Sequence, residues 1–453
     1  MLTRRTGYAR VWIVTIVIPL LLIAPALWNG YPLLQYDTGG YLARWYEGYL
    51  VPSRSTAYGI YLHLGEASHF WLNLGVQTLS VMWIVHALLR VFGIARPIQV
   101  AAIVLGLCAT TALPILTSML LTDIFAGLSV LTLFLLVVHG DRFSKPDNLF
   151  LFLFTSFAAS THSATWGVLF GLCCAGWILR PWLSARLSAR GLSRGSLTII
   201  SGAAMLLASN FALSGQFAWT PGGSGVAFGR MLQDGLVKRY LNDHCSTENL
   251  KLCPYRNQLP QTGDGFLWGK SAFNELGRFK GLGDEMAYIA WHSLVAYPGA
   301  QSEAAIMATA RQLVSVATGE GSNNWLGHTY GIMERYLPQE IAAVRNAHQQ
   351  RGELDFTEIN RVHVPVALLS MFLLAAILVD AVWRRKLDDI ALLAGTVAIA
   401  IFGNAFLCGV LSGPHDRYGA RMVWIATLVV VMAGILPREI DKTAASDMRH
   451  GAV

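Results

Sequence analysis

Charged residues are scarce in this chain of 453 residues. Only 13% are Asp, Glu, Lys or Arg, whereas 54% are hydrophobic and the mean hydropathy is +0.46. A soluble domain of this size carries about 25% charged residues. The scarcity excludes an ordinary soluble protein, because uncharged stretches long enough to cross about 30 Å of hydrocarbon recur along the chain. The sequence therefore predicts an all-α polytopic membrane protein.

Cofactor motifs are missing as well. The sequence contains no nucleotide-binding loop, dinucleotide-binding glycine fingerprint, haem-attachment motif or zinc-ligand spacing. ATP, NAD and redox cofactors therefore have no support and no metal site is predicted, although dependence on a divalent metal stays open. No repeat of fixed period is evident, which argues against a transporter built from two duplicated halves. The net charge of +7 does not indicate nucleic-acid binding, because the basic residues cluster between hydrophobic segments, where they set orientation.

Cysteines are few, and they fall into two groups. Four lie in apolar segments and are interpreted as small core residues: Cys108, Cys173, Cys174 and Cys408. The other two, Cys245 and Cys253, lie in a long polar stretch. If that stretch lies outside an inner membrane, a disulfide between them is expected. A zinc site here would lack further ligands, despite the neighbouring His244.

Ten hydrophobic segments are predicted to cross the membrane. They are Val11–Trp28, Phe70–Phe92, Ile98–Thr117, Leu121–Val138, Leu149–Ser160, Trp166–Leu179, Leu197–Leu213, Val364–Val382, Ile390–Leu411 and Met422–Leu436. The first is interpreted as a retained helix rather than a signal peptide, because no cleavage site followed by a soluble sequel is present. Residues 149–179 contain no Lys, Arg, Asp or Glu. This segment is too long for one straight span and short for two. A tight helical pair or a re-entrant hairpin is expected there.

The basic residues set the orientation of these spans. Ten spans leave seventeen Lys and Arg residues in the cytoplasmic segments, namely Arg4, Arg5, Arg10, Arg90, Arg96, Arg142, Lys145, Arg180, Arg186, Arg190, Arg194, Arg384, Arg385, Lys386, Arg438, Lys442 and Arg449. The short opposite loops hold four, namely Arg44, Arg54, Arg417 and Arg421. Cytoplasmic loops are enriched in Lys and Arg. The distribution therefore favours ten spans, an inner (plasma) membrane of the bacterial type, and both termini in the cytoplasm.

This topology divides the chain into four parts. Residues 1–213 form a first membrane part of about seven spans, with an outer loop at 29–69. Residues 214–361 form one mostly helical soluble insertion that faces outward, with amphipathic helices around Glu285–Thr318 and Gly331–Gln350. Residues 362–436 add about three spans, and residues 437–453 form a cytoplasmic tail. The insertion is too long for a linker and is expected to be a cap on the membrane part.

Acidic and titratable residues gather on the predicted outer face. Asp37 follows the first span, where a carboxylate costs solvation free energy unless it has a partner or a function. It either caps a helix that begins near Thr38 or takes part in catalysis. Asp123, at the outer start of the fourth span, is either a favourable N-terminal helix charge or a second functional acid. His162, in the turn between the fifth and sixth segments, is either structural or part of the same site.

The last outer loop is short and strongly ionic. It contains His415, Asp416, Arg417, Tyr418 and Arg421. The two arginines share one face if a helix starts in this loop. Two guanidinium groups at the lipid boundary suit a phosphate, which they bind in bidentate fashion. The alternative is an internal salt-bridge knot between these arginines and the aspartates.

These residues together resemble the C-type integral-membrane glycosyltransferases, which use polyprenyl-phosphate-linked sugars. In that family an acidic residue lies in a long first outer loop and a second lies at the start of a later span. Asp37 is similar to the first and Asp123 to the second. Tyr418, with Arg417 and Arg421, resembles an Arg-Tyr stretch that precedes a late span and contacts lipid phosphate. The resemblance covers the membrane part, not the insertion, and the short C-terminal tail departs from relatives that carry a soluble domain there.

The resemblance implies a transferase that moves a sugar from a polyprenyl-phosphate donor to an extracytoplasmic glycan, lipid or protein. The implied catalytic residues are Asp37, as base, and Asp123. No resident cofactor is expected, since the lipid-linked sugar is a co-substrate. The implied phosphate-binding residues are Arg417, Tyr418 and Arg421. Arg54, His162 and His415 are further candidates for substrate binding, because they lie on the same predicted outer face.

Other classes of function remain open at this stage. A transporter or lipid flippase would place polar groups near the bilayer midplane, whereas the ionisable residues here crowd one end of the spans. A non-catalytic envelope-assembly protein would bind a partner through residues 214–361. A membrane acyltransferase would need a histidine base, but no acyltransferase signature surrounds His162 or His415. In the insertion, Trp268 and Trp325 either stack on a sugar ring or pack in the core of the cap.

Overall fold

The computed structural model describes residues 16–220, 222–324 and 326–436. Within these ranges the chain is helical, and the only β-type pairing is an isolated bridge between Leu33 and Met119. The predicted all-helical class is therefore confirmed. Five of the described helices are long and apolar enough to cross a membrane: α6 (Trp71–Val91), α12 (Ala189–Ser214), α21 (Thr357–Trp383), α22 (Asp389–Leu411) and α23 (Asp416–Ile435).

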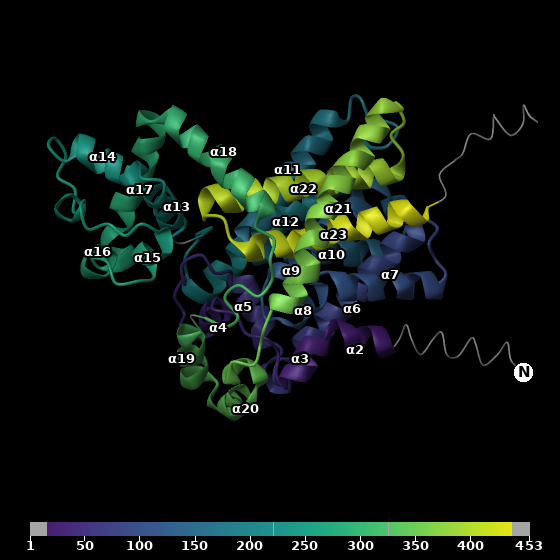
Figure 1. Cartoon of the computed structure of the whole chain (residues 1–453), viewed down its shortest axis with the longest axis horizontal. Coiled ribbons are helices and arrows are strands. Elements are labelled where there is room, and N and C mark those ends of the chain that lie inside the picture. The colour runs from purple at the N-terminus through teal and green to yellow at the C-terminus, as the bar shows by residue number, and fades with distance from the viewer. Residues whose placement is uncertain (1–15, 221, 325, 437–453) are drawn as a thin grey trace, which may run out of the picture.

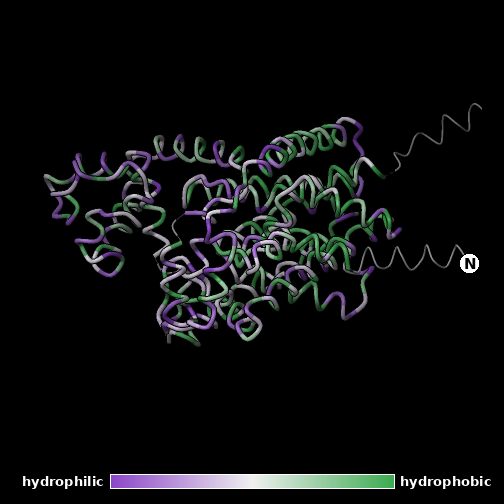
Figure 2. Tube along the Cα trace, turned by 60° about the horizontal axis from the view of Figure 1, so that its bottom comes forward, coloured by the Kyte–Doolittle hydropathy of each residue, from purple (hydrophilic) through white to green (hydrophobic). Residues whose placement is uncertain are grey.

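Shorter helices complete the bundle around these five. Three are apolar: α7 (Pro97–Thr110), α9 (Asp123–Val138) and α11 (Ser163–Leu179). The others are α2 (Ile18–Leu22), α3 (Ala24–Asn29), α8 (Leu113–Ser118), α10 (Lys145–Thr161) and the 3₁₀ turn η3 (Gly140–Arg142). Figure 2 shows that hydrophobic residues dominate the bundle, whereas hydrophilic residues are concentrated in the lobe at its far end. The apolar helices indicate a membrane-embedded protein.

The predicted span Ile98–Thr117 is not one continuous helix, because the chain breaks between α7 and α8. Thr111 is extended, and its hydroxyl accepts a hydrogen bond from the backbone N–H of Leu113 at 3.2 Å. Pro114 then stands in the first turn of α8, where its missing N–H costs nothing. The described part of the first predicted span is broken in the same way, with Pro25 in the first turn of α3. Residues 11–15 of that span lie outside the described residues.

Residues 149–179 form a helical pair. α10 and α11 pack together and are joined at His162, whose backbone is extended. Ser160, at the closed end, accepts a hydrogen bond from Ser55 Oγ through its backbone carbonyl at 2.7 Å. At the opposite end, the connection after α11 is fixed to the start of α22 by an ion pair between Arg186 and Asp389 at 2.5 Å. The pair is therefore a hairpin, and its turn lies at the end of the bundle that holds the first loop.

The loop at 29–69 is largely helical. It contains α4 (Thr38–Tyr46), α5 (Thr56–His63) and the 3₁₀ turn η2 (Glu66–Ser68). α4 packs against α5 on one side and against α19 of the insertion on another. Arg44 of α4 is fully buried and bonds to Thr56 and to Asn210, near the C-terminal end of α12. The loop is therefore an integral part of the bundle end.

The insertion contains eight α-helices and three 3₁₀ turns among the described residues. They are α13 (Gly223–Gln233), α14 (Leu236–His244), η4 (Cys253–Tyr255), α15 (Gly263–Leu267), α16 (Ala272–Glu275), α17 (Arg278–Ala296), α18 (Pro298–Val314), α19 (Gly327–Tyr336), η5 (Pro338–Glu340), α20 (Ile341–Asn346) and η6 (His348–Arg351). It has two differently packed parts. Helices α13 to α17 form a lobe around their own apolar core (Figure 1), whereas Met333 and Val344 of the second part belong to the main core of the bundle.

The lobe also contains the predicted disulfide. Cys245 and Cys253 are joined, with their Cα atoms 5.7 Å apart. The pairing closes the polar loop between α14 and η4. The prediction of a Cys245–Cys253 disulfide is therefore confirmed.

Candidate functional site

Asp37 is held in place by close packing of α4 against α19. Gly39 lies so near Thr329 that a Cβ atom at Gly39 would overlap the Thr329 backbone. The N–H of Gly39 donates to Thr329 Oγ1 at 3.0 Å, and the same hydroxyl donates to the backbone carbonyl of Gln35 at 3.1 Å. Gln35 in turn accepts a hydrogen bond from the N–H of Asp37 through its side-chain oxygen at 2.7 Å. These contacts fix the backbone on both sides of the carboxylate.

The Asp37 carboxylate lies between two guanidinium groups. Arg54 donates to Oδ1, and Nη1 of Arg417 donates to Oδ2 at 2.7 Å. The Asp37 side chain makes no capping bond to α4, so the alternative role as a helix cap is not observed. Burial opposes ionisation of Asp37, but the charges of Arg54 and Arg417 and their hydrogen bonds outweigh it and lower the pKa of the carboxyl. The carboxylate is therefore ionised at neutral pH.

A second acid–base pair lies one helical turn further along α23. Nη1 of Arg421 lies 3.4 Å from Oδ1 of Asp123, and Nη2 of Arg421 donates to Oδ1 of Asn404 at 2.6 Å. Both guanidinium groups also contact the Tyr418 ring, at 4.9 Å for Arg417 and 5.2 Å for Arg421. The arginines thus share one helix face, as predicted.

The site therefore contains the ion pairs of the salt-bridge alternative. Arg417 pairs with Asp37, and Arg421 pairs with Asp123. Asp416 takes no part, because its carboxylate accepts the backbone N–H of Ala317 at 3.2 Å. The two predicted acids lie in separate ion pairs rather than sharing one open cavity.

His162 lies beside the three arginines. Its Nδ1 accepts the backbone N–H of Ala164 at 3.2 Å, so the histidine caps α11 and has the structural role that was the alternative for it. Burial and the positive charges of Arg421, Arg417 and Arg54 lower the pKa of His162 well below its ordinary value. The imidazole is therefore neutral and leaves the site's positive charge unchanged.

His415 links the site to the lobe and to the chain after α18. Its Nδ1 lies 2.6 Å from Oε1 of Glu320, and its Nε2 lies 4.0 Å from Oδ2 of Asp264 in the lobe. The other oxygen of Glu320 accepts the backbone N–H of Arg417 at 3.1 Å. Burial lowers the pKa of His415, but the hydrogen bond and charge of Glu320 outweigh it, so that the pKa is raised. His415 and Glu320 therefore position the start of α23.

The site is rich in charged groups. Three guanidinium groups lie at the Asp37 and Asp123 carboxylates, and a third carboxylate, that of Glu320, faces His415 and the backbone of Arg417. Arg421 is 0% exposed and Arg417 is 6% exposed, whereas the side chain of Arg54 is 19% exposed. Arg54 is therefore the cation through which an anion would first meet this cluster.

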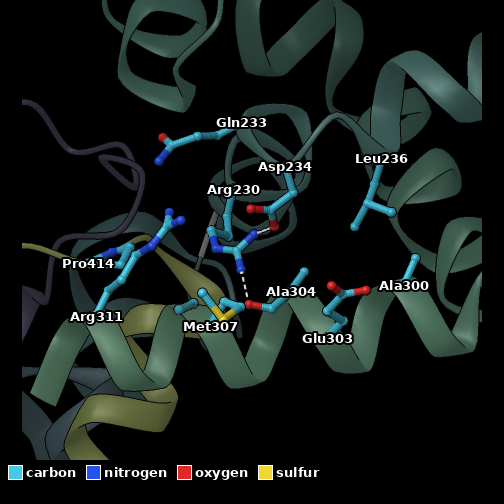
Figure 3. A pocket seen from close by; sticks show the side chains of 11 residues that line it. Arg230, Gln233, Asp234, Leu236, Ala300, Glu303, Ala304, Met307, Arg311 and Pro414 are labelled. Atoms are coloured by element: carbon cyan, nitrogen blue, oxygen red, sulfur yellow. Dashed lines mark hydrogen bonds and ion pairs between the residues drawn. The ribbon is translucent and has the colours of Figure 1, made fainter.

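A cavity of about 330 Å³ lies between α13, α18 and Pro414, the residue before His415. Figure 3 shows Arg230 inside it, paired with Asp234 and donating to the backbone carbonyl of Ala304 at 2.9 Å. Arg230 also donates to the carbonyl of Gly409 at 3.2 Å. These bonds connect the lobe to α18 and α22, so a structural role accounts for the buried Arg230. The charged residues around Asp37 are therefore a stronger candidate for the functional site than this cavity is.

Three residues of the cluster escape the sequence analysis. Asn404 orients Arg421, Glu320 holds His415, and the Tyr36 ring lies 5.4 Å from the Arg417 guanidinium. A polar Asn404 within an apolar span is a signal that points to it directly. Glu320 and Tyr36 have no such signal, because their contacts join segments far apart in the sequence. Glu320 lies in the insertion and Tyr36 in the first loop, whereas the partners of both lie at the start of α23.

The remaining predictions concern metal and sugar binding. No group of three or more His, Cys, Asp or Glu side chains that could hold a metal ion occurs in the described ranges. Trp268 is 47% exposed and lies beside Phe279 at the edge of the lobe core, with the ring centroids 6.2 Å apart. Trp325 lies outside the described residues.

No family model, curated protein or solved structure matches the chain. The likeness to the C-type glycosyltransferases therefore stays a prediction drawn from the residues.

Proposed function

We propose that this protein is a membrane glycosyltransferase that moves a sugar from a polyprenyl phosphate to an extracytoplasmic acceptor. The observation that carries the proposal is the Asp37 carboxylate between Arg54 and Arg417, next to the Arg421–Asp123 pair. Such a cluster joins an ionised acid to three guanidinium groups at one end of apolar helices. The phosphate of a lipid-linked donor would bring its negative charge to these guanidinium groups.

The proposed topology has ten spans, with the lobe and the Asp37 cluster outside and both termini in the cytoplasm. Two observations support it. The hairpin of α10 and α11 returns the chain to its starting end, where Arg186 pairs with Asp389. The arginine-rich connection between α11 and α12 then lies at the opposite end from Asp37, as expected for a cytoplasmic loop of an inner membrane protein.

In the proposed reaction, the donor phosphate competes with Asp37 for the guanidinium groups of Arg54 and Arg417. Withdrawal of these charges raises the pKa of Asp37 and makes it a better base. The acceptor hydroxyl then transfers its proton to Asp37 as its oxygen forms a bond to the anomeric carbon. The bond from that carbon to the phosphate oxygen breaks, and the electron pair leaves with the phosphate. The arginines stabilise the negative charge on the departing phosphate.

The test uses purified full-length protein in phospholipid vesicles with a panel of polyprenyl-phosphate sugars. Consumption of a donor and release of polyprenyl phosphate are followed by mass spectrometry. D37N should lower turnover by about 10²- to 10⁴-fold, the usual contribution of a general base. D141N is the matched control, because Asp141 pairs with Arg194 at the other end of the bundle. Full turnover by a folded D37N protein would remove the catalytic assignment.

A non-catalytic role in envelope assembly is the second candidate. Asp37 and Asp123 are buried and already paired, which is also what a purely structural ion-pair core requires. In that case the lobe, which has a core of its own, would bind a partner. This candidate would be favoured if the wild-type protein consumed no donor. It would also be favoured if the wild-type protein bound polyprenyl phosphate no more strongly than neutral polyprenol.

A further inference from the structure

Helices α17 and α18 expose large apolar side chains. No Asp, Glu, Lys or Arg occurs between Glu285 and Glu303. On α17, Trp291 is 68% and Val295 is 72% exposed, and on α18, Ile306 is 69% exposed. Single exposed apolar residues are ordinary, but a set on two consecutive helices indicates a surface that is covered.

Each of these helices already buries one face. On α17, Met286 and Ile289 are fully buried in the lobe core. On α18, Ala308 is buried where α18 meets α22, and a Cβ atom at Gly409 of α22 would lie 2.9 Å from its carbonyl oxygen. Packing within the protein therefore accounts for the inner faces only. The outer faces, which carry Trp291 and Ile306, need another partner.

The C-terminal end of α18 enters the ends of the apolar bundle. Val316, which follows it, is 1% exposed and clusters with Ala367 of α21 and Val423 of α23. The backbone at Ser315 lies against Gly419 of α23, where a Cβ atom would clash with it. α18 thus leads from the lobe to the depth of residues 419–423, beside α22 (Figure 1).

α22 and α18, which pack together, both expose large apolar side chains. Phe402, Phe406 and Leu411 of α22 are 57%, 45% and 52% exposed, as expected for a helix that faces lipid. Val314, near the inner end of α18, is 63% exposed. Because α18 packs against α22, which is apolar enough to cross the membrane, we expect the exposed apolar side chains of both helices to meet the same lipid.

We propose that α17 and α18 form an interfacial hairpin that rests in the lipid bilayer surface. Trp291, Val295, Ile306 and Val314 enter the boundary between headgroups and acyl chains, the depth that apolar faces of interfacial helices reach. Tryptophan is enriched at this boundary, which suits the exposed Trp291. The lobe is then docked on the membrane beside the Asp37 cluster, whatever reaction occurs there.

The test is spin-label accessibility in full-length protein reconstituted in phosphatidylcholine–phosphatidylglycerol vesicles. Single labels are placed at W291C, I306C and V314C, after Cys108, Cys173, Cys174 and Cys408 are replaced by serine and the disulfide is kept. F402C is the lipid reference, and N257C, at an exposed site in the loop after the disulfide, is the water reference. Folding of each variant is checked by its melting temperature in detergent.

The expected result is that all three labels relax faster with oxygen than with a water-soluble nickel chelate, as F402C does. Two outcomes would overturn the proposal. Nickel accessibility equal to that of N257C would show that the hairpin faces water. Low accessibility to both reagents, with spin–spin broadening, would show that a second copy of this chain covers the surface.

Discussion

Among single residues, the two buried arginines of α23 differ in how far each depends on its carboxylate. Arg421 has other acceptors, since Asn404 accepts from its Nε and Nη2, and Cys408 Sγ lies 3.2 Å from Nη2. Arg417 has the ion pair with Asp37 and the faces of two tyrosine rings, and its Nε is buried without a hydrogen-bond partner. Loss of a carboxylate should therefore affect the two arginines unequally.

D37N should destabilise the protein more than D123N does. Removing one partner of a buried pair leaves an uncompensated charge, which costs about 3–5 kcal/mol. In D123N, Arg421 keeps its bonds to Asn404, and the loss should be about 1.5–3 kcal/mol, that of one hydrogen bond to a charged group. The measurement is the melting temperature of each purified variant in the same detergent. Equal shifts for the two variants would contradict the asymmetry.

His415 should make stability depend on pH near neutrality. Its pKa is raised in the folded state, chiefly because Glu320 outweighs burial. A raised pKa contributes stability that is fully present below the unfolded pKa of about 6.5 and is lost as the pH rises through the folded pKa. The melting temperature should therefore fall between pH 6 and pH 8.5 by more in the wild type than in H415Q. Parallel pH profiles for the two proteins would show that the His415–Glu320 contact contributes nothing.

The contribution of Asp37 to stability depends on pH in the opposite direction. Its pKa is lowered, chiefly because Arg54 and Arg417 outweigh burial, so its contribution is present above the unfolded pKa of about 3.9 and is lost in stronger acid. The pH effect of His415 is therefore separable from that of Asp37.

Between elements, the contact of α18 with α23 is set by a glycine. Gly419 lets the backbone of Ser315 and Val316 approach α23, whereas Gly434 near the other end of the same helix has open space around its Cα. The two glycines form a matched pair in one helix.

G419A should destabilise the protein, and G434A should not. An added methyl group at Gly419 forces the Ser315 carbonyl away from α23, and overpacking of this kind costs about 1–3 kcal/mol. At Gly434 the alanine meets no neighbour and favours the helix. The measurement is the melting temperature of each variant. A G419A protein as stable as G434A would show that the Ser315 backbone does not pack tightly against α23.

Across the whole molecule, the two ends of the bundle should lie on opposite sides of the membrane. Arg256 belongs to the lobe, whereas Arg186 lies in the connection between α11 and α12. In intact cells, R256C should react with a membrane-impermeant maleimide, and R186C should react only after permeabilisation. Both variants are made in a background without the four free cysteines. Labelling of the two positions from one side would contradict the proposed ten-span topology.

The sequence by itself determined the class of the protein and several local features. Scarcity of charge and recurring apolar runs predict membrane helices, because helix formation in lipid depends on the local run of residues. The same local reasoning predicts the Cys245–Cys253 disulfide, which the structure contains. It fails at Thr111–Pro114, where hydropathy continues through a position at which the backbone breaks.

The tertiary structure decided which charges meet. The sequence places Asp37, Asp123, Arg417 and Arg421 on one face but does not say that Arg417 pairs with Asp37 while Arg421 pairs with Asp123. It also does not reveal that the insertion splits into a separate lobe and a part that joins the bundle core. These partners are hundreds of residues apart, and their pairing depends on how whole helices pack. Local hydropathy and spacing carry no information about that packing.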